Sequence, residues 1–290
     1  MSLRAFCCFM LFLSCGTQEA PAPQSGSFEA LTYNVAGLPE GLSSSHPEVY
    51  MPQISPLLNS YDLVLVQEDF TYHHELVSEL EHPHPSPAMD ISESESLMTD
   101  GLNRFSQFSF SEYTRTKWVA CFGGIDGHGS DCLADKGFTF AVHDLGEEVP
   151  VHIYNFHAEA GGGEEDNTAR EKGYEQLIEY ILTHSNEAAV IVGADTNLHG
   201  NDPADEPVLI NFMEQTKLAD VCRTLECGNE QIDRFFFRNS SQLIITPTFW
   251  EIAPEFVTEE GSPLSDHPAI HVTFEWQENE TQSSNTVASP

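Results

Sequence analysis

The sequence predicts a single α/β domain of about 250 residues. Three observations predict this class. The chain has 290 residues, of which 40% are hydrophobic, which is enough for a sizeable core and too apolar for a disordered chain. Apolar runs of strand length alternate with stretches of helical spacing. No internal repeat is visible, and no linker interrupts the alternation after residue 27.

The predicted elements begin with two short apolar strands, at residues 28–35 and 63–66, each ending at a polar residue. A third strand at residues 149–154 precedes a helix at residues 167–184, where Leu177, Ile178, Ile181 and Leu182 recur at helical spacing. The remaining predicted elements are a strand at residues 188–193, a helix at 208–216, and strands at 232–238, 243–245 and 269–276.

Residues 1–15 resemble an export signal of the lipoprotein type, because a basic start and an apolar stretch are followed by Ser14-Cys15. The stretch is too short to span a bilayer. We expect cleavage before Cys15 and its lipidation; a plain secretory signal and a buried N-terminal element are the alternatives. The predicted remainder is a Pro/Ser/Gly tether at residues 16–27, the domain at 28–276 and a loose polar tail at 277–290.

Three of the seven cysteines lie within residues 1–15, which leaves four for disulfides. Four cysteines allow three pairings, and pairing agrees with export. We expect the two local pairs, Cys121–Cys132 and Cys222–Cys227, because each closes a short loop. A zinc site is the competing interpretation, but no C-x₂-C spacing occurs.

The charge excludes an ordinary polyanion-binding protein. The chain has 46 acidic and 11 basic residues, which give a net charge of −35. A DNA-binding protein commonly neutralises about 6–10 phosphates with clustered Lys and Arg. No such cluster is visible. We expect the scarce cations near the motifs, Arg104, Lys136 and Arg170, to lie at the surface, and contact with a phosphate is the alternative.

Polar side chains follow the predicted strands at the points where they end. An Asn or Asp after one strand is ordinarily a turn residue or a helix cap. Six such places in one chain instead indicate a catalytic edge. They are Asn34, Gln67-Glu68, Asn155-Phe156-His157, the segment from Gly193 to Asn197, Ser265-Asp266-His267 and, at the front of its strand, Asp233.

The order of these motifs resembles the endonuclease/exonuclease/phosphatase superfamily, which includes deoxyribonuclease I-like nucleases, bacterial neutral sphingomyelinases and inositol polyphosphate 5-phosphatases. The resemblance extends over residues 28–276. One departure is that the usual Gly-Asp-x-Asn reads Gly193-Ala194-Asp195-Thr196-Asn197, with an extra residue after the glycine. The resemblance implies a four-layer αββα sandwich of two packed mixed β-sheets flanked by helices, with the active site at one rim.

The resemblance also implies a metal-dependent hydrolase of phosphate esters. Glu68 is then the principal metal ligand with Asn34 beside it, and Asp266 completes the metal side. Carboxylate and amide oxygens suit Mg²⁺, with Mn²⁺ or Ca²⁺ as alternatives.

Two histidines and three polar residues are expected to handle protons and phosphate. We expect His157 to protonate the leaving oxygen, and His267 with Asp195 to act on the attacking water. Asp233 is expected to hydrogen-bond His267 and fix its tautomer. Asn197 is expected to bind the phosphate beside Asp195, because residues two apart in an extended segment point the same way.

The charge then favours one substrate class. A zwitterionic phospholipid head group has no net charge, whereas DNA is repelled by an acidic surface. We therefore predict a monomeric phosphodiesterase of phospholipid head groups that is similar to sphingomyelinases. An extracellular nuclease or small phosphate-ester phosphatase with the same site is one alternative, and a catalytically silent surface binding protein is another.

Overall fold

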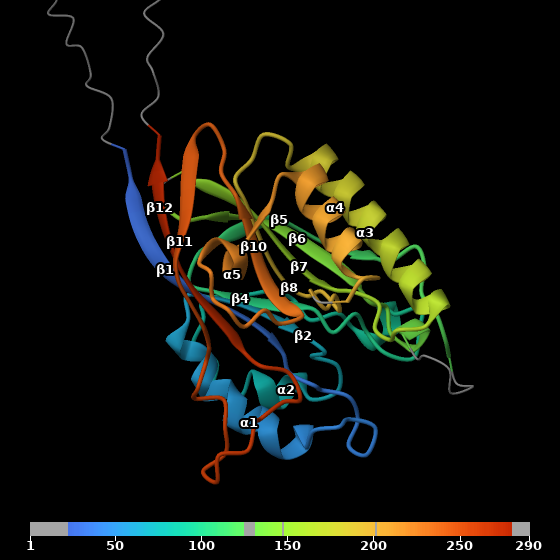
Figure 1. The fold of residues 1–290 in the computed structure, drawn as a ribbon. Helices are drawn as coiled ribbons and strands as arrows, with labels where there is room; N and C mark the ends of the chain where they lie inside the picture. The colour runs from blue at the N-terminus through green and yellow to red at the C-terminus, as the bar shows by residue number, and fades with distance from the viewer. Residues whose placement is uncertain (1–22, 125–130, 147, 201, 280–290) are drawn as a thin grey trace, which may run out of the picture.

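The computed structural model describes residues 23–124, 131–146, 148–200 and 202–279. Two six-stranded sheets pack face to face, and helices cover parts of both outer faces (Figure 1). The predicted four-layer αββα sandwich is confirmed. Among the described residues, no helix is both long and apolar enough to cross a membrane.

The first sheet has the strand order β11-β12-β1-β2-β4-β3. Its central strand β1 (Ser25–Asn34) is parallel to β2 (Leu63–Gln67) and antiparallel to β12 (Ile270–Glu278). The remaining strands pair antiparallel; they are β11 (Leu243–Ile252), β4 (Asn103–Ser106) and β3 (His84–Pro85).

The second sheet has the order β5-β6-β7-β8-β10-β9. Its central strands β7 (Pro150–His157) and β8 (Val190–Asp195) are parallel. The other pairings are antiparallel and involve β5 (Phe110–Lys117), β6 (Gly137–Asp144), β10 (Asp233–Arg238) and β9 (Ala219–Asp220). Both sheets are therefore mixed, with one central parallel pair each.

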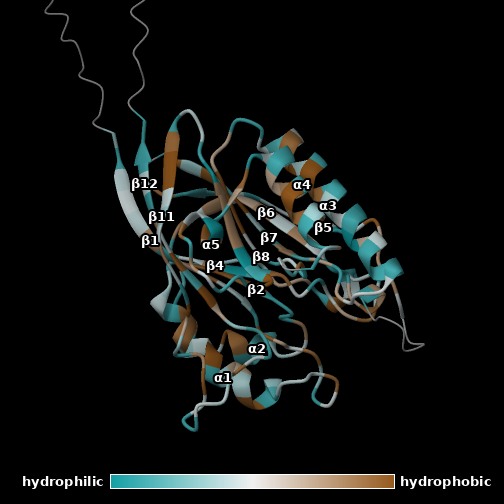
Figure 2. Ribbon diagram, viewed as in Figure 1, coloured by the Kyte–Doolittle hydropathy of each residue, from teal (hydrophilic) through white to brown (hydrophobic). Residues whose placement is uncertain are grey.

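Helices α1 (Pro47–Leu57) and α2 (His73–Leu76) cover the first sheet, and α3 (Glu164–His184) and α4 (Glu206–Thr216) cover the second. Figure 2 shows hydrophobic and hydrophilic residues alternating along these helices, as expected where one side packs on a sheet. The short elements are α5 (Val221–Thr224) and the 3₁₀ turns η1 (Leu58–Ser60), η2 (Ile91–Glu93) and η3 (Asp131–Leu133).

The central strands are continuous apolar runs because both of their faces are buried. In β1, Phe28 and Ala30 face the interior between the sheets, and Leu31 and Tyr33 belong to the cluster under α1. The same alternation in β8 sends Ile191 inward and the flanking valines toward α3 and α4. Because both faces of the central strands are buried, these strands are held in fixed positions, and so are the polar residues at their ends.

Several elements were not predicted. Helix α1 contains Pro52 and Pro56. Proline is unfavourable inside a helix, so the sequence of this segment does not predict one. Strand β6 has Thr139 and His143 among its apolar residues, and both side chains are buried against Arg104. Strand β5 is an edge strand whose side chains are mostly half-buried or exposed, so it lacks an apolar run.

The boundaries of the domain also differ from the prediction. Strand β1 begins at Ser25, so the last three residues assigned to the tether pair with β12. Strand β12 continues to Glu278, so the assigned tail begins inside a strand. The expected signal and Cys15 lie outside the described residues.

Both expected disulfides are present and the prediction of local pairing is confirmed: Cys121 is bonded to Cys132, and Cys222 to Cys227.

Helix α3 starts three residues before its predicted start. The Asp166 carboxylate accepts from the Gly163 backbone N–H at 2.9 Å, and acids are favoured in a first helical turn.

Candidate active site

The polar strand ends meet at one edge of the two packed sheets. Asn34 ends β1, His157 ends β7 and Asp195 ends β8, while Asp233 starts the antiparallel neighbour β10. Within the second sheet, Asp195 is the register partner of both His157 and Asp233. The pairing of the strands therefore places these three side chains in one row.

Asp195 lies at the centre of the site and is almost fully buried. Its Oδ2 accepts from Asn34 Nδ2 at 2.9 Å, which joins the two sheets. The same oxygen is 3.2 Å from His157 Nε2 and 3.8 Å from His267 Nε2. Two imidazoles thus face one carboxylate.

His267 is held by Asp233, as predicted, with 2.9 Å between Nδ1 and Oδ2. Burial alone lowers the pKa of this imidazole. The hydrogen bond and charge of Asp233, together with the charges of Asp195 and Asp266, outweigh burial and raise the pKa of His267 to about 10. In the metal-free protein His267 is therefore a cation at neutral pH.

His157 has the opposite environment. It is buried, and its Nε2 is 3.9 Å from Glu68 Oε1. Burial, with the positive charges of Lys136 and His267, lowers the pKa of His157 well below its ordinary value. The His157 imidazole is therefore neutral.

Glu68 follows β2 in a left-handed backbone conformation, with φ of 57°. Gly37 N donates to Glu68 O at 3.0 Å, and a Cβ on Gly37 would lie 2.4 Å from that oxygen. Only glycine fits this approach, so Gly37 helps to hold Glu68 in a conformation that is costly for a non-glycine residue. Such strain at a polar strand end is typical of functional sites.

The backbone at Asn197 differs from the extended segment that the sequence predicts, and Asp266 lies at the rim of the site. Asn197 has φ of 48°, so the segment after β8 is not extended and the argument from alternation is wrong. Its Nδ2 donates to Ala158 O at 3.1 Å. Asp266 is exposed at the rim, where its carboxylate accepts from the Ser44 hydroxyl. It lines an open hollow of about 430 Å³ with Asp233, His267 and Glu230.

The three cations expected at the surface are buried instead, so that expectation is wrong. Lys136 bears directly on the site: its Nζ is 2.6 Å from Asp131 Oδ1, and its charge acts on Glu68, His157 and Asp195. In the sequence, the only signal for Lys136 is that basic residues are rare in this acidic chain. Arg104 and Arg170 are bonded within the protein interior.

The donor set fits a hard divalent cation. Burial raises the pKa of Glu68, while Lys136 and a hydrogen bond from Asn34 lower it. The carboxylates of Glu68 and Asp195 both approach His157 Nε2. The Glu68 side chain remains 18% exposed, so an ion can reach it. Asp195, Asp233 and His267 also place one ligand atom each within 4.8 Å of one another. Oxygen-rich groups of this kind are suited to Mg²⁺, Mn²⁺ or Ca²⁺.

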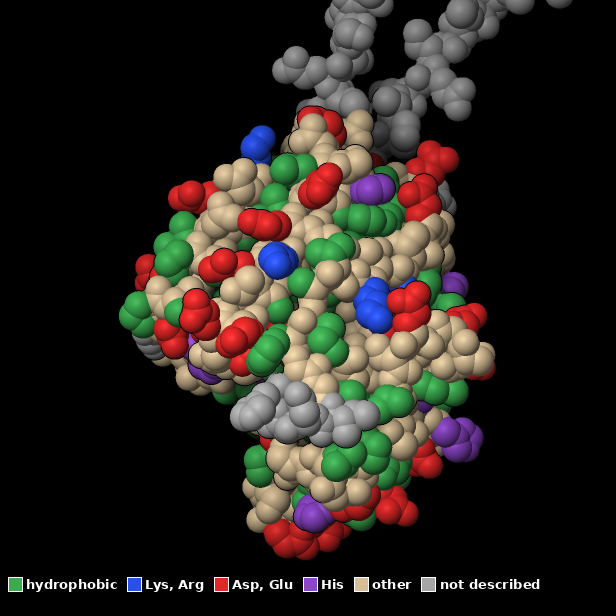
Figure 3. Space-filling view, turned by 90° about the vertical axis from the view of Figure 1, so that its right-hand side faces the viewer, with side chains coloured by type: hydrophobic (Ala, Val, Ile, Leu, Met, Phe, Trp, Pro, Cys, Tyr) green, Lys and Arg blue, Asp and Glu red, His purple; other side chains and the backbone are tan. Residues whose placement is uncertain are grey.

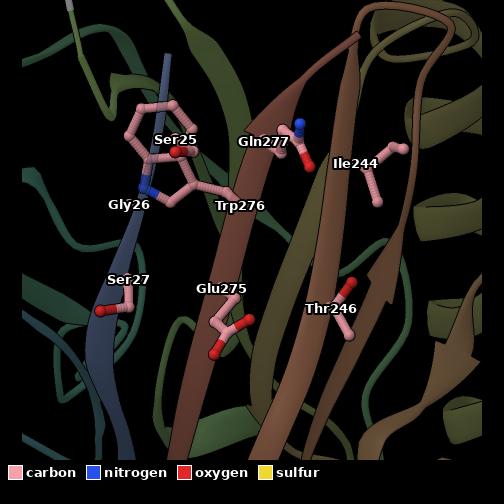
Figure 4. Close-up of a pocket in the computed structure, with 8 residues that line it drawn as sticks. All are labelled: Ser25, Gly26, Ser27, Ile244, Thr246, Glu275, Trp276 and Gln277. Atoms are coloured by element: carbon pink, nitrogen blue, oxygen red, sulfur yellow. The ribbon is translucent and has the colours of Figure 1, made fainter. Parts of the chain in front are cut away.

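A second hollow of about 430 Å³ lies at the other end of the first sheet, over the start of β1, the end of β12 and β11 (Figure 4). Glu275 is the only acidic group among its lining residues, and no histidine or cysteine lines it. The second hollow therefore lacks the cluster of carboxylates and imidazoles that is present at the edge around Asp195.

The chain resembles curated sphingomyelinases. It is 32% identical over 273 residues to proteins named sphingomyelinase from Mycobacterium bovis (strain ATCC BAA-935 / AF2122/97) and Mycobacterium tuberculosis (strain ATCC 25618 / H37Rv), covering 87% of this chain and 53% of each relative. The chain thus spans about half the length of the curated relatives it matches. No family model matches the sequence.

Solved structures share the fold at low identity. A mutant of beta toxin from Staphylococcus aureus with bound magnesium ions has a TM-score of 0.63 at 14% identity, covering 85% of this chain and 99% of that one. Sphingomyelinase C from Streptomyces griseocarneus has a TM-score of 0.62 at 18% identity, covering 86% and 99%. An endonuclease/exonuclease/phosphatase protein from Beutenbergia cavernae has a TM-score of 0.62 at 13% identity, covering 86% and 71%. The chain is therefore a homologue of the mycobacterial sphingomyelinases and has the fold of the endonuclease/exonuclease/phosphatase superfamily.

Proposed function

We propose that the protein is an exported, Mg²⁺-dependent phosphodiesterase that hydrolyses phospholipid head groups in the manner of a sphingomyelinase. The observation that carries the proposal is the convergence on Asp195. Two imidazoles lie 3.2 and 3.8 Å from one of its oxygens, and Glu68 is 3.9 Å from the nearer imidazole. Acid, base and metal ligand are thereby within reach of one phosphate.

Each side chain has a proposed role. Glu68 and Asn34 hold the cation, and Asp266 extends the acidic rim. His267, oriented by Asp233, accepts the proton of the attacking water, and Asp195 orients that water. His157 donates a proton to the leaving oxygen, and Asn197 helps to bind the phosphate.

In the metal-free site His267 is protonated and His157 is neutral. For the proposed roles, His267 has to lose its proton and His157 has to gain one. A divalent cation, which Glu68 and Asn34 would hold, would supply positive charge that favours binding of the anionic phosphate. The negative phosphate raises the pKa of His157, since it favours the imidazolium. The bound phosphate thus moves His157 toward its proposed role, and His267 has to lose its proton before it can act as the base.

The molecular surface supports a neutral head group over a polyanion. Figure 3 shows acidic side chains scattered over one face with few basic ones, in agreement with the net charge of −35. The buried Arg104, Lys136 and Arg170 are also removed from the set of cations that can contact DNA phosphates. The nuclease and the small-ester phosphatase remain outcomes of the assay below.

Export as a lipoprotein and a monomeric state belong to the same proposal. The sequence of residues 1–15 and the two disulfides support export. Lipidation is tested by fatty-acid labelling, which should depend on Cys15. The monomeric state is tested by light scattering on the purified protein.

The activity test compares three substrates. The purified protein is offered sphingomyelin vesicles, plasmid DNA and bis(p-nitrophenyl) phosphate, with Mg²⁺ and with EDTA. We expect Mg²⁺-dependent cleavage of the lipid, EDTA to abolish it, and His157→Ala and His267→Ala each to lower kcat roughly 10²–10⁴-fold. His184→Ala, at an exposed histidine at the end of α3, is the matched control. Cleavage of DNA but not lipid contradicts the substrate, and inactivity on all three contradicts the enzyme.

A further inference from the structure

The segment that follows β5 bonds to the residues around His157 at three places. Each bond joins a side chain to a backbone group, and the three are spaced over four successive residues of the β7–α3 connection. Trp118 Nε1 donates to His157 O at 2.7 Å, Phe122 N donates to Glu159 Oε1 at 2.7 Å, and Ala160 N donates to Asp131 Oδ2.

A disulfide links the second and third of these contacts. Cys121 directly precedes Phe122, and Cys132 directly follows Asp131. The cross-link therefore fixes the two residues that bond to Glu159 and Ala160. A disulfide limits the conformations open to the segment it closes, which keeps both partners near their acceptors.

His157 has a particular need for such support. The ring of His267 is oriented by the bond from its Nδ1 to Asp233. The Nδ1 of His157 is buried, and it has no hydrogen-bond partner within the residues that the structure describes. Apart from the approach of its Nε2 to Asp195 Oδ2 at 3.2 Å, the position of the His157 ring therefore depends on packing and on the backbone that carries it.

Glu159 ties the same backbone to its surroundings. It is almost fully buried, and charged groups approach it from η3 (Asp131), from the residue before β6 (Lys136) and from α3 (Asp166). Arg170 on α3 also donates to the carbonyl oxygen of Glu159 at 2.7 Å. A buried carboxyl that accepts a backbone N–H is a strong anchor for the chain.

We propose that residues 118–122 and 131–132 form a clamp that positions His157 for proton transfer, and that the Cys121–Cys132 disulfide keeps this clamp closed. The inference rests on the proposed catalytic role of His157. Trp118 and Glu159 are positioning residues, because they act through the backbone of residues 157–160. The clamp closes only where the disulfide forms, so the active conformation requires an oxidising compartment.

The first test removes each disulfide in turn. In the double variant Cys121→Ser/Cys132→Ser we expect kcat to fall roughly 10- to 100-fold with KM within about twofold, because a small displacement of a catalytic group costs turnover. The matched control Cys222→Ser/Cys227→Ser loses the other disulfide and is expected to retain kcat within about twofold. Equal loss in both variants contradicts the clamp, because it shows only a general effect of losing a cross-link.

The second test breaks single contacts. Trp118→Phe keeps the ring and removes the N–H, so we expect kcat to fall with KM unchanged. Glu159→Gln keeps an oxygen for the Phe122 N–H and is expected to retain kcat, whereas Glu159→Ala is expected to lose it. Normal kcat in both Trp118→Phe and Glu159→Ala overturns the proposal.

Hydrogen exchange provides a readout that does not depend on activity. In the folded Cys121→Ser/Cys132→Ser variant we expect the Ala160 amide to exchange at least about tenfold faster, since its acceptor is no longer fixed. If that variant does not fold, the same amide is followed in Glu159→Ala, which keeps both disulfides and removes the acceptor of the Phe122 N–H. Unchanged exchange overturns the clamp. An inactive wild-type protein whose Ala160 exchange still depends on the disulfide overturns the proposed function and leaves the clamp standing.

Discussion

At the scale of single residues, His157 and His267 differ because of what touches their second ring nitrogen. His267 Nδ1 is 2.9 Å from Asp233, whereas His157 is surrounded by buried groups and the charge of Lys136. In the metal-free site, the His267 imidazole is therefore cationic and the His157 imidazole neutral, beside the same Asp195 carboxylate. Asp233 maintains this difference.

Replacing Asp233 tests its effect on His267. The pKa of His267 in the folded protein, about 10, is above the ordinary value of about 6.5, so proton binding stabilises the fold. This contribution is fully present below pH about 6.5 and is lost as the pH rises through about 10. In Asp233→Asn we expect the imidazole of His267 to titrate at lower pH by NMR in metal-free protein. The exposed Asp144→Asn serves as control, and an unchanged midpoint in Asp233→Asn contradicts the assignment.

The residue types of the site could be predicted because strand-end motifs are local in sequence. Asp233 was expected to bond His267, and the two are in contact. Lys136 and Trp118 could not be predicted, because their approach to the site depends on how the β5–β6 connection packs on β7. The left-handed turn at Asn197 was also missed, since the sequence pattern suggested continued extension there.

At the scale of elements, the central strands were predictable because burial on both faces leaves an unbroken apolar run. Strand β6 was not, since it carries Thr139 and His143 into the interior, where Arg104 bonds to both. Helix α1 was not, since its prolines conceal the helical pattern. In both cases tertiary contacts supply what the local pattern lacks.

Gly193 in β8 shows how tightly the sheets approach. A Cβ at this position would lie 2.7 Å from Leu65 Cδ1 and 2.8 Å from Phe235 Cε1. We expect Gly193→Ala to lower the free energy of unfolding by about 1–3 kcal/mol, as overpacking of a core does. Urea denaturation measures this change. Gly162→Ala, where no atom lies within 4 Å of the added Cβ, is the control, and equal stability of the two variants would refute the argument.

At the scale of the whole molecule, acidic charge dominates the surface. The chain carries 46 acidic and 11 basic residues, and several of the basic residues are buried in ion pairs or hydrogen bonds. Net charge of this size destabilises a compact state through self-repulsion. The folded protein is therefore expected to respond strongly to ionic strength.

The salt response is measured as the midpoint of thermal unfolding at pH 7. Raising NaCl from about 0.01 M to about 0.5 M shortens the screening length from roughly 30 Å to a few ångströms, so we expect the midpoint to rise by several degrees. The same series near the isoelectric point of about 4.4 is expected to show a much smaller effect. A midpoint at pH 7 that falls with salt would show that specific ion pairs outweigh the repulsion.

The two ends of the described domain lie side by side, because Ser25 in β1 pairs with Gln277 in β12 (Figure 1). Asn34 is at the other end of the same ten-residue strand, about 30 Å away. A short linker between Gln24 and Asn279 would close the domain into a ring, with new ends opened at an exposed turn such as Gly261. For the same reason, a bead or vesicle that holds the protein by either end leaves the edge around Asp195 facing outward, toward an opposing surface.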